Sequence, residues 1–144
     1  MEINIFDEAG GAAYMKAKAY LQLAEPFAEM RAQVDLIKRG EIHEKISPSR
    51  RLELDARLSK AFRSVGAYAY FFKKPKALRE LFAAEPDAIG SRLLALSESF
   101  YDLCGRSASD QAKGNRDRGL EKLCAKWLAE EDQANQDLGQ LLAE

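Results

Sequence analysis

The residues of this chain that could do chemistry are few, and their spacing does not suit catalysis. The only histidine, His43, lies between Glu41 and Glu44 in a charged segment. Any Ser-His-Asp or Cys-His arrangement would have to use this one imidazole, whose setting is typical of a surface histidine. We therefore predict no catalytic residues and a protein that is not an enzyme.

Metal and nucleotide sites have equally little support. Cys104 and Cys124 do not form a C-x-x-C pair, and we expect two small buried side chains. The acidic run 130–132 could chelate a hard cation, but a solvated acidic helix face is the commoner arrangement. Gly10 and Gly11 lack the longer glycine motifs that cradle phosphates. We predict no metal and no cofactor.

A basic stretch indicates a different chemistry, the binding of an anionic partner. Residues 48–79 hold nine basic and two acidic residues, a net charge of +7. On a helix with about 100° per residue, counted from Leu54, three cations fall at about 300°, 240° and 180°: Arg57, Lys60 and Arg63. They line the side opposite the apolar stripe. This side is either a partner-binding face or a face that is solvated or paired within the protein.

Two aromatic residues near the end of the same stretch also point away from the stripe. Tyr70 and Phe71 fall at about 160° and 260° on this projection. Cover by the next segment is the simpler arrangement, because burying a Phe gains roughly 1.5–3 kcal/mol; exposure for a partner is the other. The residues available for cover are Leu78, Leu81 and Phe82. Our candidate partner-binding residues are Arg57, Lys60, Arg63, Tyr70, Phe71, Lys73 and Lys74.

A long helix must position these side chains. Its apolar residues recur in steps of four and three, which places them in one stripe: Leu54, Leu58, Ala61, Val65, Tyr68 and Phe72. Ser47 is a good N-cap, and Pro48 suits the first helical position. A helix over 48–72 is roughly 37 Å long at about 1.5 Å per residue, so it needs neighbours along its length. We predict that it is the central helix of a bundle.

The segments before and after this helix also show helical spacing. Residues 12–39 predict a pair of nearly continuous helices that is interrupted at Pro26 and ended by Gly40 as a C′ residue. A short helix over 76–84 follows the long one.

The last third of the chain predicts two more long helices. The first covers 86–104 and is closed by Gly105; the second covers 120–142, where Glu131 interrupts the apolar seam. Glu131 then lies at the edge of the seam or pairs with a cation of the central helix. The polar segment 105–119 is the main connection between them.

These elements predict an all-α, single-domain helical bundle of five or six helices over residues 1–144. Only residues 1–6 alternate like a strand, and we expect a short extended N-terminal arm over 1–11. No apolar run approaches the roughly 20 residues that a membrane span needs, and the acidic start is unlike a signal peptide. We expect a cytoplasmic protein with no membrane partner.

Two function hypotheses follow from the segregation of charge. The net charge is −1, yet 80–105 and 119–144 each carry −4 against the +7 of 48–79. We expect a non-enzymatic protein-binding module, a small regulator, inhibitor or adaptor that acts through its basic and aromatic helix face and could form a homodimer. The alternative is a nucleic-acid-binding protein that uses the cationic 48–79 face and the 106–118 loop. In a variant of that alternative, the acidic helices mimic nucleic acid and block a basic partner.

Overall fold

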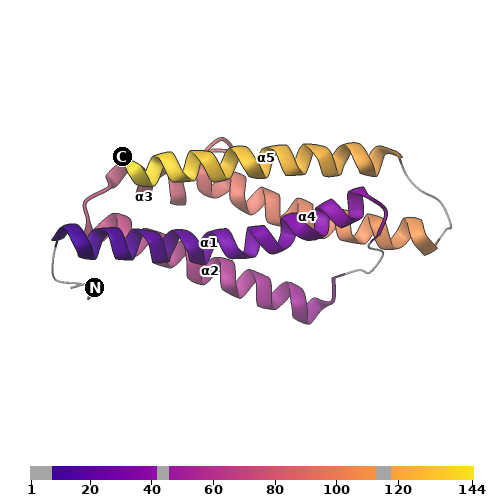
Figure 1. Ribbon diagram of the computed structural model, residues 1–144, viewed down its shortest axis with the longest axis horizontal. Coiled ribbons are helices and arrows are strands. Elements are labelled where there is room, and N and C mark those ends of the chain that lie inside the picture. The colour runs from indigo at the N-terminus through magenta and orange to yellow at the C-terminus, as the bar shows by residue number, and fades with distance from the viewer. Residues whose placement is uncertain (1–7, 42–45, 113–117) are drawn as a thin grey trace.

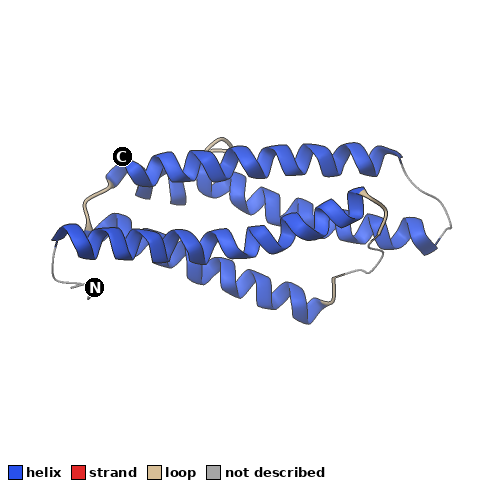
Figure 2. Ribbon diagram, in the orientation of Figure 1, coloured by secondary structure: helices blue, strands red, loops and turns tan. Residues whose placement is uncertain are grey.

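The computed structural model describes residues 8–41, 46–112 and 118–144, and these ranges contain five α-helices and no strand (Figures 1 and 2). The helices are α1 (Glu8–Lys38), α2 (Pro48–Phe71), α3 (Pro75–Phe82), α4 (Ile89–Ala112) and α5 (Arg118–Ala143). The predicted all-α class is therefore confirmed, with the smaller of the two expected helix counts.

The four long helices alternate in direction, and the short α3 lies at one end of the bundle (Figure 1). α1 contacts α2, α4 and α5, whereas the main contacts of α2 are with α1 and α3. α3 also contacts α4, so it lies between α2 and α4. The expectation that the 48–72 helix is central is wrong. α2 keeps a cationic side in solvent and can bury only the other side, so α1 takes the central place.

α1 is continuous through Pro26, where the sequence predicts an interruption. Proline cannot donate to the carbonyl of Gln22, which costs helix stability, but the Pro26 ring is fully buried in the core. Tertiary packing offsets the lost hydrogen bond. α1 also begins at Glu8, so residues 8–11 of the predicted extended arm are helical, and the rest of that arm lies outside the described residues.

The end of α1 and the start of α2 have the predicted caps. Gly40 has a φ of 78°, and the N–H groups of Gly40 and Glu41 each donate at 2.9 Å, to the carbonyls of Ile37 and Leu36. This pair of bonds is a Schellman turn. The hydroxyl of Ser47 accepts a backbone N–H of the first turn of α2 at 3.2 Å. Local capping chemistry thus fixes both helix ends.

α4 begins at Ile89 rather than at 86, and it runs past Gly105, where the sequence predicts its end. The φ of Gly105 is not positive, and buried side chains stand on both sides of it, at Cys104 and Ser107. The helix continues because this side still packs in the core. The predicted connection 105–119 is therefore helical as far as residue 112.

One core runs through the bundle, and the predicted stripe of α2 faces it. The stripe residues Leu54, Leu58, Ala61, Val65 and Tyr68 are buried, and Phe72 packs against them from the edge. Between α4 and α5, the indole N–H of Trp127 donates to the carbonyl of Leu96 at 2.8 Å. The core thus satisfies the polar atom of its largest side chain.

Candidate protein-interaction surface

The last turn of α2 exposes two aromatic side chains. Tyr70 is 78% exposed and Phe71 is 71% exposed. The expectation that the next short helix covers them is wrong. α3 turns Leu81 toward the core, while the ring of Phe82 lies over Gly66, 2.9 Å from the point where a Cβ would stand. The two rings of α2 are therefore left without a cover among the described residues.

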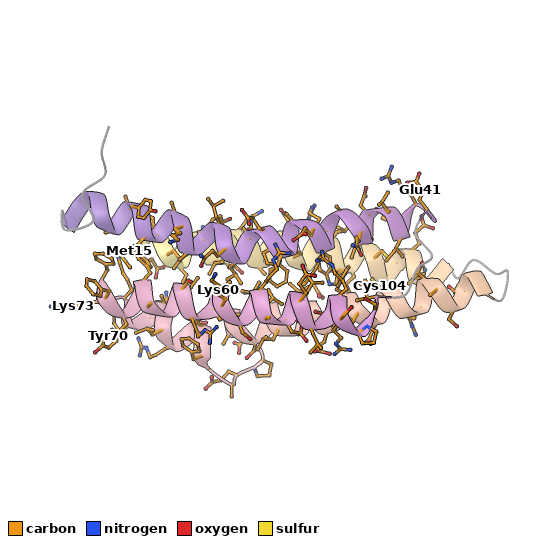
Figure 3. All side chains as sticks on the ribbon, turned by 90° about the horizontal axis from the view of Figure 1, so that it is seen from below. Met15, Glu41, Lys60, Tyr70, Lys73 and Cys104 are labelled. Atoms are coloured by element: carbon orange, nitrogen blue, oxygen red, sulfur yellow. The ribbon has the colours of Figure 1, made fainter. Side chains whose placement is uncertain are left out.

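The turn after α2 places two lysines next to these rings. The backbone of Lys73 is in the left-handed conformation, with a φ of 55°. The N–H of Lys73 donates to the carbonyl of Tyr70 at 3.3 Å, and the N–H of Lys74 donates to the carbonyl of Ala69 at 2.7 Å. This second Schellman turn ends α2 and leads into Pro75, the first residue of α3. Figure 3 shows Tyr70 and Lys73 at the same end of the bundle.

The arginines in the first half of α2 are engaged within the protein. Arg50 and Arg57 pair with Glu29 of α1 at 3.2 and 2.5 Å, and Arg51 pairs with Glu98 of α4 at 2.9 Å. Partial burial alone would raise the pKa of Glu29, but hydrogen bonds and charge from the two arginines outweigh burial and hold this pKa below its ordinary value. Arg57, a candidate partner-binding residue, thus contributes to the contact between α1 and α2.

The cations in the second half of α2 are different. Lys60 and Arg63 are exposed, and neither forms an ion pair with a residue that the structure describes. Lys73 is exposed and Lys74 is half-buried, and neither of them forms an ion pair with a described residue. We call these side chains and the two rings the aromatic–basic surface: Lys60, Arg63, Tyr70, Phe71, Lys73 and Lys74.

Helical geometry aligns each ring with a cation. Arg63 and Tyr70 are two turns apart and lie within about 20° of one line along the helix. Lys60 and Phe71 are about three turns apart and share a neighbouring line in the same way. The surface is therefore two parallel rows, each with a positive charge at one end and an aromatic ring at the other.

Among the described residues, Leu52 and Phe82 are the most exposed large apolar residues outside the predicted site. Leu52 is 70% exposed near the start of α2, and Phe82 is 61% exposed at the end of α3. Leu52 has a sequence signal, because it falls at about 160° on the helical projection, the same angle as Tyr70. The exposure of Phe82 has none, because it depends on how α3 docks.

A groove of about 640 Å³ lies between α4 and α5, and it too has no sequence signal. Its charged lining residues are of both signs: Arg51, Asp102, Arg106, Lys126 and Glu130. Two of them, Lys126 and Glu130, pair with each other at 3.7 Å. The balanced charge favours no one class of ligand.

The acidic run of α5 spreads its carboxylates rather than gathering them. Glu131 is buried and accepts a bond from Arg31 of α1 at 2.6 Å, so its partner is not a cation of the 48–72 helix. Arg31 also donates to the carbonyl of Leu128 at 3.2 Å. Glu130 and Asp132 are exposed. Across the described ranges, no group of three or more metal-ligating side chains lies close enough to hold an ion.

The two cysteines are free and buried, as the sequence predicts. Burial raises the pKa of Cys104 to about 12, with Cys124 adding to it, and burial raises the pKa of Cys124 to about 11. Such thiols hold almost no thiolate at neutral pH, so both are poor nucleophiles. The remaining candidate for catalysis, His43, lies outside the described residues.

Comparison of the chain with models of known families, with curated proteins and with solved structures finds no match. Among the described helices, none combines the length and the apolar character needed to cross a membrane. The function of this all-α protein therefore has to be argued from its own surface.

Proposed function

We propose that this chain is a non-enzymatic protein-binding module, a small regulator, inhibitor or adaptor, and that it acts through the aromatic–basic surface. The observation that carries the proposal is the exposure of Tyr70 and Phe71, at 78% and 71%, next to cations without a described acidic partner. Tyr, Phe and Arg are enriched in the cores of protein interfaces. A partner that covers one such ring gains roughly 1.5–3 kcal/mol from apolar burial.

The ring of Phe71 also has aromatic neighbours that lead to the core, which favours a binding role over a merely tolerated exposure. The ring of Phe71 lies 5.5 Å from that of Phe72, and Phe72 lies 5.4 Å from the buried ring of Tyr68. This chain of contacts ties Phe71 to the core, so that a partner meets at this position a side chain that loses little freedom on binding. The free cysteines suit a reducing compartment, and we place the module in the cytoplasm.

A paired-variant capture experiment tests the proposal. The double variant Tyr70→Ser with Phe71→Ser should retain the stability of the wild type within about 0.5 kcal/mol per site, because both side chains are exposed. It should lose most of the binding of proteins that the immobilised wild-type chain captures from the source cells. Leu94→Ser is the matched control, since Leu94 is 53% exposed on α4. Equal capture by the double variant and the wild type would refute the proposal.

Nucleic-acid binding is the competing function, and the exposed cations of α2 are the observation that favours it. Phosphate contacts make binding fall steeply with salt, by a slope of about −0.9 per phosphate on a logarithmic scale for duplex DNA. Against it, the arginines at 50, 51 and 57 already have protein partners. Fluorescence anisotropy with a labelled duplex at two salt concentrations separates the two functions. Binding that Lys60→Ala weakens and the ring variants leave intact would favour nucleic acid.

A further inference from the structure

The outer side of α2 is open well beyond the aromatic–basic surface. Leu52 and Tyr70 are 70% and 78% exposed. Their separation in the sequence is about five full turns, so both side chains point the same way. Arg63 lies between them, within about 20° of the same line. The three side chains therefore form one row that spans roughly 27 Å at about 1.5 Å per residue.

Most of this row is flat enough for a second helix, which would meet two larger side chains: Arg63 on the row and the ring of Phe82, which lies over Gly66 beside it. Between Leu52 and Tyr70 the outer side carries small exposed residues, Ala56, Ser59 and Ala67. The main helix contacts of α2 are with α1 and α3, and α2 forms one flank of the bundle (Figure 1). Packed helices need axes about 8–10 Å apart, and small side chains permit such an approach.

The charges on this side select the chemistry of the occupant. Lys60, Arg63 and Lys73 have no acidic partner among the described residues. The acidic residues of α2 are both engaged, Glu53 with an arginine at 2.8 Å and Asp55 with a tyrosine hydroxyl at 2.8 Å. A basic segment would be repelled by Lys60 and Arg63 in the middle of the row, whereas carboxylates there would neutralise these two charges.

We infer that the partner of this surface presents an acidic amphipathic helix of about five turns, which lies along α2 from Leu52 to Tyr70. Apolar residues near both ends of that helix cover Leu52 and Tyr70, and carboxylates in its middle face Lys60 and Arg63. This is helix-on-helix recognition in which apolar contacts at both ends hold the partner and the charges between them select its sign. The inference rests on the proposed function and specifies its partner.

A display library of helical peptides of about 20 residues tests the inference. Each peptide of the library is designed with apolar residues at helical spacing along one face, and its other positions are drawn evenly from Glu, Lys and Gln. Selection on the full chain should enrich Glu over Lys in the middle third of the peptides. The double variant Lys60→Glu with Arg63→Glu should reverse that preference toward Lys. If these two residues had only a structural role, the preference would not reverse.

Single variants then test the length of the contact. Measured by fluorescence polarisation with the most enriched peptide, Leu52→Ser and Tyr70→Ser should each weaken the Kd tenfold or more. The control Leu94→Ser, with its side chain 53% exposed on α4, should change the Kd less than twofold. All variants are compared at matched folded fractions, which urea titration provides.

The outcomes separate this inference from the proposed function. Loss with Tyr70→Ser but not with Leu52→Ser overturns the helix along α2 and leaves a shorter protein contact at the rings. Enrichment without Glu preference, or no enrichment at all, overturns the acidic helix, while the capture experiment with the ring variants judges the proposed function independently. A dimer of this chain that Leu52→Ser dissociates overturns the inference in favour of a second copy.

Discussion

The substitution Gly90→Ala should damage the fold, because Gly90 is where the backbones of α3 and α4 approach each other. A Cβ at this position would stand 1.8 Å from the carbonyl oxygen of Leu81 and 2.6 Å from its carbonyl carbon. Carbon and oxygen atoms in contact normally lie about 3.3–3.6 Å apart, so the two backbones must separate by about 1.5 Å. Both atoms belong to the main chain, and no rotamer change relieves the clash.

The expected magnitude follows from what α3 buries. Forcing extra volume into a packed contact costs typically 1–3 kcal/mol, and partial exposure of Leu81, now 4% exposed, adds about 1 kcal/mol. We expect Gly90→Ala to lower the free energy of unfolding by about 2–4 kcal/mol. At about 3 °C for each kcal/mol in a chain of this size, the Tm should fall by about 6–12 °C.

Urea titration followed by far-UV circular dichroism measures this loss, and two other helical glycines are matched controls. No atom lies within 4 Å of a Cβ added at Gly105 or Gly139. Alanine at either site should therefore raise stability by about 0.5–1 kcal/mol through helix propensity. If Gly90→Ala is as stable as these controls, the backbones of α3 and α4 do not approach each other this closely. The position of Phe82 over Gly66, which depends on the docking of α3, would then be wrong as well.

Three further predictions use other features of the chain. Lys73→Gly should stabilise the protein by about 1 kcal/mol in the same assay, because Lys73 holds a left-handed φ of 55° that glycine adopts without strain. Hydrogen bonds and neighbouring arginines outweigh burial and lower the pKa of Glu29 and of Asp137 below the ordinary carboxyl values. Both carboxylates therefore stabilise the fold at neutral pH, and this contribution is lost as pH falls through their lowered pKa values. Glu29→Gln should make the free energy of unfolding fall less steeply on acidification. The thiols of Cys104 and Cys124, with pKa values near 12 and 11, should react with a disulfide reagent at pH 8 only after denaturation, and rapid labelling of the native protein would contradict their burial.

The helix ends that the sequence predicts correctly are those set by local chemistry. Gly40 and Ser47 act through bonds to residues three or four positions away, so their neighbours in sequence suffice to identify them. Pro26 and Gly105 mislead because each is read as a stop signal, whereas burial on both sides carries the helix through. The local cost of a proline, about 3 kcal/mol in an isolated helix, says nothing of the packing that offsets it.

The candidate site divides in the same way. Angles on a helical projection depend on sequence alone, and they correctly place Tyr70 and Phe71 away from the core. Which cations stay unpaired depends instead on the helix that lies opposite. Glu29 of α1 engages Arg57, yet no described residue engages Lys60, one turn further along, and nothing in the spacing of these residues distinguishes them.

In the proposed function, α2 has two roles along its length. Its first half uses arginines to hold α1 and α4 through Glu29 and Glu98, so removing those charges should weaken the fold and binding together. Its second half keeps Arg63 and Tyr70 outside the packing, so changes there should affect binding with little effect on stability. In this arrangement the first half of α2 fixes the orientation of the helix, and the second half offers its side chains to an anionic partner.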